Sequence, residues 1–184
     1  MSFQKKWDKH LKRFHELSDR HWEAHETPTG DDNMDWLGPC GSVLDIGCGY
    51  GHAGIKLIGS GKKVSGLDIH PLNVEQAKSK GLDARLGDMH DLPFPEEFFD
   101  GAMLWDVLEH CLAPLVVLWE CQRVLKSGGR LLIYIPSDSW ADHPVHTIIP
   151  TRTQMQHLFN KSGFRQEAVF DINGGGSRYH ATRL

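Results

Sequence analysis

The stretch VLDIGCGYG, residues 43–51, places a short apolar run directly before three glycines at every second position. A short apolar run ending in glycines is typical of a buried strand followed by a tight turn. In an α/β fold the turn after a buried strand is where the backbone can approach a ligand closely. This stretch therefore predicts the first strand of an α/β domain and a candidate binding turn.

The spacing of the three glycines narrows the choice of ligand. Gly47, Gly49 and Gly51 form G-x-G-x-G, because position 52 is His, and not the G-x-G-x-x-G of dinucleotide-binding turns. No G-K-[ST] triplet marks a phosphate-binding loop. NAD and ATP are thus disfavoured, while S-adenosylmethionine, or a turn that binds nothing, stays open.

Short apolar runs alternate with helix-like segments from Ser42 onward, which predicts a mainly parallel sheet with helices on both faces. The expected strands are residues 42–46, 63–68, 83–87, 99–105, 130–135, 165–171 and 178–183. The expected helices are residues 51–59, 72–80, 113–126 and 151–162. Gly128-Gly129 is expected to end the third of these helices.

An additional amphipathic helix is expected at the N-terminus, because apolar residues recur there mostly at steps of three or four. They are Phe3, Trp7, Leu11, Phe14, Leu17 and Trp22. Pro28 and Gly30 then indicate a linker. We expect residues 1–30 to be a helix and linker packed on an α/β domain of residues 31–184, where the apolar stripe either docks on the core or covers a ligand site.

Composition limits the partners. The chain has 184 residues, 40% of them apolar, a net charge of −4 and a pI near 6.3, which suits one domain and gives no reason to expect nucleic acid or an anionic membrane as a partner. The charged N-terminus has no signal-peptide core, so a cytoplasmic protein is expected. The four cysteines include no CxxC pair and predict reduced thiols.

Two carboxylates follow later strands. Asp68 lies 21 residues after Gly47, the spacing of an acid that accepts from ribose hydroxyls, and we expect it to be partly solvated at the strand end. That signal is shared by NAD and adenosyl cofactors. Asp88 follows the third strand, where it could accept from the adenine amine or serve only as a turn or helix-cap residue.

Four segments in this order and spacing resemble the class I S-adenosylmethionine-dependent methyltransferases, and most closely their small "type 11" members. They are VLDIGCGYG, GLDIHP, GDMHDLPFPEEFFDGAMLWDVLEH and LWECQRVLKSGGRLLIYIP. The resemblance covers residues 42–136, and Gly163-Phe164 resembles the family's entry into its sixth strand. It implies a Rossmann-like sheet of seven strands with the last strand antiparallel, and S-adenosyl-L-methionine as the cofactor.

The resemblance also implies a cofactor pocket built from residues at or just after predicted strand ends. Those around the amino-acid part of the cofactor would be Asp45, Gly47, Cys48, Gly49 and Gly51. Those along the remainder would be Asp68 for the ribose, Ile69, Asp88 and Met89 for the adenine, and Trp105 and Asp106 beside the methionyl group. A Trp at 105 departs from the family, where smaller residues are common. The chain also ends with the expected last strand, which suggests a truncated or compact protein.

The implied reaction is methyl transfer to a small-molecule acceptor by in-line displacement, in which alignment alone can account for much of the rate. If a proton must leave the acceptor, the candidate bases are His110, His143 and His146, among 12 histidines in all. The long segment SDSWADHPVHTIIP would add Trp140 as a stacking surface. No metal site is expected, because no carboxylate or cysteine completes a set with His143 and His146.

Two other functions stay open. One is a binding or scaffolding subunit that has the methyltransferase fold but no activity. The other, less favoured, is a nicotinamide-dependent oxidoreductase, because the chain lacks a plausible Tyr-x-x-x-Lys pair as well as the dinucleotide spacing. DNA is disfavoured as a substrate, because neither an Asn-Pro-Pro-Tyr type signature nor a base-recognition domain is present.

Overall fold

The computed structural model describes Lys5, Lys9, Lys12 and residues 34–137, 144–172 and 175–184. The three lysines are helical, but most of the expected N-terminal helix, its linker and the boundary at residue 30 lie outside the described residues. Trp140 and His143 lie outside them as well. Within the described part of the chain, no helix has the length and apolar content needed to span a bilayer.

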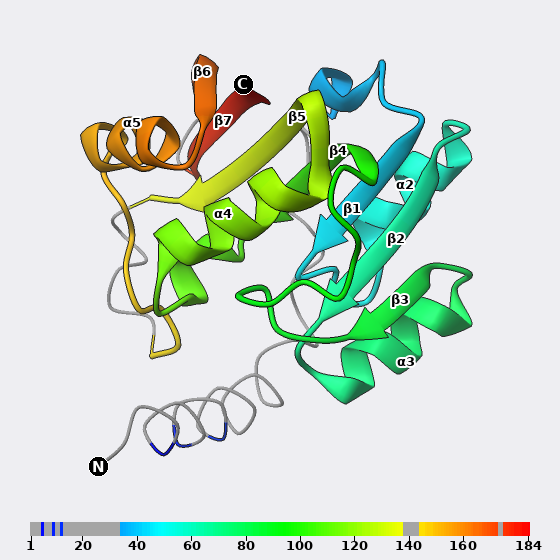
Figure 1. Cartoon of the computed structure of the whole chain (residues 1–184). Coiled ribbons are helices and arrows are strands. Elements are labelled where there is room, and N and C mark those ends of the chain that lie inside the picture. Colours follow the sequence, from blue (N-terminus) through cyan, green and yellow to red (C-terminus); the bar gives the residue numbers. More distant parts are fainter. Residues whose placement is uncertain (1–4, 6–8, 10–11, 13–33, 138–143, 173–174) are drawn as a thin grey trace.

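Seven strands form one sheet in the order β3-β2-β1-β4-β5-β7-β6 (Figure 1). Their bounds are β1 Ser42–Ile46, β2 Lys63–Asp68, β3 Asp83–Leu86, β4 Phe99–Trp105, β5 Leu125–Pro136, β6 Phe164–Ile172 and β7 Gly176–Arg183. The pairs among β1 to β5 are parallel, whereas β7 is antiparallel to both β5 and β6. The predicted α/β class, strand number and antiparallel last strand are confirmed.

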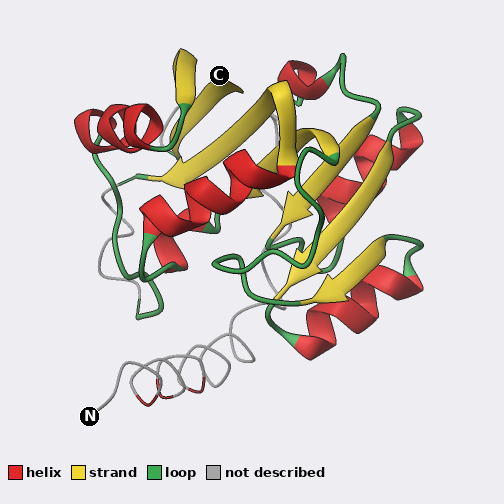
Figure 2. Ribbon diagram, viewed as in Figure 1, coloured by secondary structure: helices red, strands yellow, loops and turns green. Residues whose placement is uncertain are grey.

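Helices cover both faces of the sheet (Figure 2). Their bounds are α2 His52–Gly59, α3 Pro71–Ser79, α4 Pro114–Val124 and α5 Arg152–Lys161, with the short 3-10 helices η2 Asp35–Leu37 and η3 Leu108–His110. Successive strand residues face opposite layers, as a pleated strand requires. Leu104 packs in the layer of α4 and α5, and its neighbour Met103 packs in the layer of α2, α3 and η2.

The expectation that Gly128-Gly129 ends a helix is wrong. Helix α4 ends at Val124, and Leu125 already has the extended angles φ −79° and ψ 144°. The pairing of β5 with β4 then passes from Phe99 opposite Leu125 to Gly101 opposite Arg130, so the two glycines lie in an irregularity of the sheet. Gly128 has φ +74°, which glycine adopts at little cost. The glycines therefore bend a strand and do not cap a helix.

Helix α5 begins with a capping box. The Thr151 hydroxyl accepts from the backbone N–H of Gln154 at 3.3 Å, and the Gln154 side chain accepts from the backbone N–H of Thr151 at 2.8 Å. These reciprocal bonds satisfy two backbone donors that a helix start leaves without partners. The cap fixes where the chain enters the helix that packs Met155 and Phe159 into the core.

We predict that Thr151→Ala lowers the free energy of unfolding by about 1 kcal/mol, because it removes the cap. Thr153→Ala is the control: Thr153 is exposed on the same helix, and alanine is the better helix former. Urea denaturation of both variants measures the difference. Equal effects of the two substitutions would contradict a specific role for the cap.

Candidate active site

A cleft lies at the edge of the sheet where the parallel strands end. It encloses about 470 Å³, part of it open to solvent. Its lining includes six residues that the sequence analysis singled out: Gly47, Asp68, Ile69, Met89, Asp106 and His110. The chain leaves β1 toward β2 on one side and returns to β4 on the other, and ligands of open α/β sheets bind at such a switch point.

The glycine turn after β1 forms part of the cleft wall. The N–H groups of Gly47 and Cys48 donate to the carbonyl oxygen of Leu67 at 2.7 and 2.9 Å, which ties the turn to β2. Gly47 has φ +71°, and a Cβ there would lie 2.4 Å from Val107 Cγ2. Only glycine therefore lets the turn after β1 meet the segment after β4 this closely.

The Asp68 carboxylate fastens this turn to the next one. Its Oδ2 accepts from the Gly49 N–H at 2.8 Å, and its Oδ1 accepts from the His70 N–H at 2.8 Å and from Asn73 Nδ2 at 3.1 Å. The expectation of a partly solvated side chain is wrong, because Asp68 is 7% exposed. Burial raises the pKa of Asp68, although these hydrogen bonds act in the opposite direction.

Four of the predicted cofactor residues, Asp45, Cys48, Gly49 and Gly51, do not line the cleft. Asp45 is 2% exposed, Cys48 is buried, and Gly51 packs against α3, where an added Cβ would lie 3.2 Å from Ala77. Burial, with a smaller contribution from Asp68, raises the pKa of Asp45 to about 7. Burial also raises the pKa of the Cys48 thiol. These side chains support the turn from within the core.

Asp88 and Trp105 are also engaged away from the cleft lining. Asp88 Oδ1 accepts from the His90 N–H at 2.9 Å and lies 2.7 Å from His90 Nδ1. Burial acts to raise the pKa of Asp88, but the bonds from His90 outweigh it and leave the pKa below its usual value. The Trp105 ring stacks on Tyr134 of β5, with centroids 5.0 Å apart and planes at 14°. This stacking accommodates the large residue at position 105.

Acidic side chains follow β4 at the other wall of the cleft. Asp106 lines the cleft and has φ +52°, an unusual angle for a residue other than glycine, of the kind found at functional sites. Burial raises its pKa to about 7. Glu109 in η3 is 1% exposed, and burial together with Asp106 raises its pKa well above the usual range. Glu109 was not among the predicted site residues. Its only signal was an acid inside the apolar run VLEHCL.

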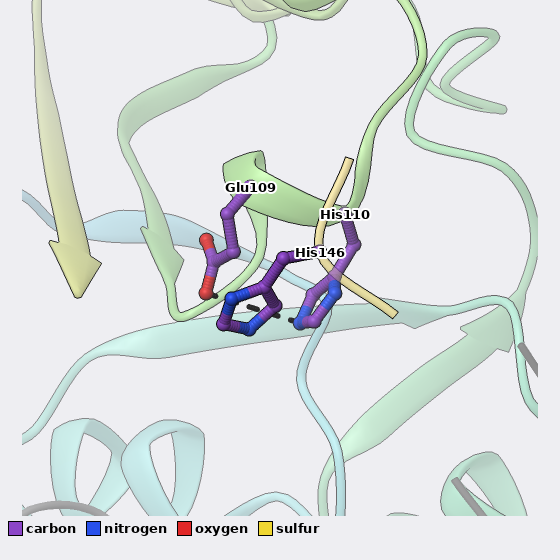
Figure 3. A group of neighbouring side chains, drawn as sticks. All are labelled: Glu109, His110 and His146. Atoms are coloured by element: carbon purple, nitrogen blue, oxygen red, sulfur yellow. Dashed lines mark ion pairs between the residues drawn. The ribbon is translucent and has the colours of Figure 1, made fainter. Parts of the chain in front are cut away.

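Two of the three candidate histidines lie together. The ring centroids of His110 and His146 are 4.9 Å apart, and Figure 3 shows both rings beside Glu109. The segment carrying His146 is fastened to η3, because the Thr147 N–H donates to the Glu109 carbonyl oxygen at 2.7 Å. The structure thus brings together residues 36 positions apart at the cleft wall that His110 lines.

The fold and the cleft together define an α/β protein with a candidate binding site at the switch point of its sheet. A family model described as a methyltransferase domain matches residues 44–133. This match, together with the fold and the cleft, supports the class I S-adenosylmethionine-dependent methyltransferases as the family of this chain and S-adenosylmethionine as its cofactor.

The sequence is also similar to those of curated methyltransferases. A probable S-adenosylmethionine-dependent methyltransferase of Mycolicibacterium smegmatis is 27% identical over 142 residues, 72% of this chain and 55% of that protein. The O-methyltransferase cnsE of Penicillium expansum is 31% identical over 152 residues, 71% and 54% of the two chains. This chain therefore spans about half the length of these curated relatives.

A solved structure has the same fold over nearly the whole chain. It is the complex between the Haloferax volcanii Trm112 methyltransferase activator and a protein assigned as a methyltransferase. The match has a TM-score of 0.74 and 19% identity, and it covers 99% of this chain and 97% of the other. At this identity the likeness concerns the fold alone.

The cleft fits an adenosyl cofactor by its own geometry. Gly47 lines the cleft and has no side chain, so a ligand can approach the backbone of the turn. Asp68 lines the same cleft and, with three hydrogen bonds already accepted, keeps about one of its roughly four acceptor positions for a hydroxyl group. Ile69 and Met89 add apolar surface.

We predict that Gly47→Ala weakens binding of S-adenosylmethionine at least about 10-fold, because the new methyl group forces Val107 or the turn out of place. Gly61→Ala is the matched control. Gly61 has φ +86°, so alanine is strained there too, but no atom lies within 4 Å of the added Cβ. Calorimetry measures both affinities. Equal losses would show that backbone strain, and not the shape of the cleft, decides binding.

We also predict a pH effect at Asp45. Its pKa is raised in the folded state, so between about pH 4 and pH 7 the native protein holds a proton that the unfolded chain releases. This group therefore makes stability fall as pH rises, by up to about 1.4 kcal/mol per pH unit in that window.

Asp45→Asn removes this contribution, and its stability relative to the parent should increase from pH 4 to pH 7. Denaturant unfolding of both proteins across the window measures the effect, while Asp68 is present in both. A constant difference between the two proteins would mean that Asp45 stays ionised in the fold.

Proposed function

We propose that this chain transfers a methyl group from S-adenosylmethionine to a small-molecule acceptor by in-line displacement. The observation that carries the proposal is the composition of the cleft. One wall offers the glycine turn, Asp68 and Ile69, which suit the cofactor, and the other offers Asp106 and His110, which suit a polar acceptor. The cleft thus offers one wall for the methyl donor and another for the acceptor, as transfer between two bound molecules requires.

The residues on the cofactor wall have distinct roles in this proposal. Asp68 would accept from a ribose hydroxyl through Oδ2, which has one hydrogen bond to the chain where Oδ1 has two. Ile69 would pack on the adenine, and Met89 would cover its face. Asp45, Cys48, Gly49 and Gly51 would shape the turn around the amino-acid part. Asp88 and Trp105 would act through their neighbours Met89 and Asp106.

When bound, the cofactor supplies a methyl group that is already activated by its sulfonium centre. The protein mainly has to hold the acceptor atom in line with that methyl group and exclude water, and such alignment can supply about 7 to 11 kcal/mol. A hydroxyl or ammonium acceptor must also lose a proton. We propose His110 or His146 as the base; His110 lines the cleft and the His146 ring lies beside it, which supports this role. Trp140 and His143 stay predictions.

An oxygen acceptor is the first to test, because the relative from Penicillium expansum is described as an O-methyltransferase. The sequence gives no reason to expect nucleic acid or a membrane as a partner, and a cytoplasmic location stays a prediction. The solved neighbour that is complexed with an activator suggests that turnover could require a second protein. The scaffolding alternative would retain cofactor binding without any turnover.

We predict that the full chain, incubated with S-adenosylmethionine and a panel of small hydroxylated, carboxylated and amino compounds, forms S-adenosylhomocysteine with one methylated compound in equal amounts. Mass spectrometry measures both products. Gly47→Ala should lower the rate at limiting cofactor, whereas Gly61→Ala should not. Saturable cofactor binding without a methylated product, with and without a Trm112-type activator, would favour the scaffolding subunit.

A further inference from the structure

The Glu109 carboxylate is buried although no hydrogen bond from the described part of the chain satisfies it. Its side chain is 1% exposed, and neither carboxylate oxygen has a hydrogen-bond partner among the described residues. The His110 Nε2 atom lies 3.8 Å from Glu109 Oε1, beyond hydrogen-bond distance. Because a buried carboxylate without hydrogen bonds is costly, buried charges in proteins are normally paired or bound to metal ions.

Two imidazoles stand beside this carboxylate, as Figure 3 shows. One ligand atom from each of Glu109, His110 and His146 can be chosen so that all three lie within 4.8 Å of one another. Ligands bound at about 2.0–2.2 Å to one tetrahedral ion lie roughly 3.3–3.6 Å apart. A contraction of about 1 Å between the side chains would therefore bring all three ligand atoms onto one ion.

Hydrogen bonds already hold the set in a state suited to a cation. His110 Nδ1 lies 3.1 Å from the Val145 carbonyl oxygen, which can only accept, so Nδ1 carries the proton and Nε2 keeps its lone pair. The backbone N–H groups of Thr147 and Ile148 donate to the Glu109 carbonyl oxygen at 2.7 and 3.2 Å. These two bonds keep the segment of His146 against η3.

A proton on Glu109 would explain the geometry less completely than a cation would. Protonation removes the charge, but the new O–H group and the other oxygen would still lack partners among the described residues. A cation neutralises the carboxylate and uses the lone pairs of both imidazoles at the same time. Two imidazoles with one carboxylate suit first-row transition ions better than Mg²⁺ or Ca²⁺.

We propose that Glu109, His110 and His146 bind a divalent transition-metal ion, such as Zn²⁺, Fe²⁺ or Mn²⁺, at the wall of the cleft after β4. Three protein ligands leave at least one coordination position open, which is the arrangement of catalytic metal sites. His110 lines the cleft, and so does Asp106 four residues before it. No metal site was expected from the sequence, because the completing carboxylate lies in another segment of the chain.

Only the effect of this metal site on the choice of acceptor rests on the proposed function. With the open position facing the cleft, the acceptor class would be compounds whose oxygen atoms can bind the ion, such as those with neighbouring hydroxyl groups or a carboxylate. The site itself is independent of any turnover. Metal binding and methyl transfer can therefore fail separately.

The test uses the full chain without an affinity tag, freed of metal by a chelator and titrated with Co²⁺ and Zn²⁺. We expect one ion per chain by calorimetry and a visible absorption band when Co²⁺ binds. His146→Ala and Glu109→Gln should each weaken binding at least about 10-fold. His157→Ala is the control, because His157 is exposed on α5 and distant in sequence from the set.

Cofactor binding separates this proposal from the preceding one. His146→Ala should bind S-adenosylmethionine within about two-fold of the parent in the absence of metal, which also shows that the variant is folded. Because residue 109 is buried, the result for Glu109→Gln is interpreted only if thermal unfolding of this variant remains cooperative. Absence of Co²⁺ binding by the parent chain, or equal affinity in the parent and His146→Ala, would overturn the metal site, whatever the outcome of the methylation assay.

Discussion

The three hydrogen bonds accepted by the Asp68 carboxylate are the constraint on which the rest of the site depends. They join the glycine turn after β1 to the turn after β2 and to Asn73 in α3. Two neighbouring strands and one helix are thereby fixed at the point where the cleft opens. Asp68 holds the backbone of the cleft and, in the proposed function, also binds the ribose, so it cannot be substituted for one purpose alone.

Acidic groups gather around this cleft. Burial raises the pKa values of Asp45, Asp68, Asp106 and Glu109, so the interior holds four carboxyl groups that ionise reluctantly. A cationic ligand would favour their ionised forms. The cost of burying these groups is therefore offset most fully when the cleft contains positive charge, which suits a sulfonium cofactor and, under our proposal, a metal ion.

The strands could be predicted closely because each is a short apolar run bounded by turn residues, as for β1 and β2, whose ranges match those expected. Predictions became less accurate where tertiary contacts decide. Gly128-Gly129 looked like a helix end, but the pairing of β5 with β4 places it in a strand. Asp45 and Cys48 were expected around the cofactor, but both are buried in the core and support the turn. Asp88 was expected to hold the adenine, but it accepts a hydrogen bond from His90.

Glu109 shows the limit of reading spacing along the chain. Its acidity and position before His110 were visible in DVLEH, but its histidine partner at 146 comes from beyond β5. A metal set sought within one segment could not include it. Only the folding of the segment after β5 onto η3 brings the groups together.

That attachment has a consequence for how this protein can change over evolution. The segment after β5 is held to η3 by the backbone N–H groups of Thr147 and Ile148, which every residue except proline provides. The Ile148 side chain is exposed and takes no part in these bonds, whereas the Thr147 hydroxyl also donates to the His110 carbonyl oxygen at 3.2 Å. The attachment of this segment thus depends largely on backbone groups, so side chains such as Ile148 can change while the path of the segment beside His110 is kept. Related sequences could in this way come to recognise different compounds without any change in the glycine turn.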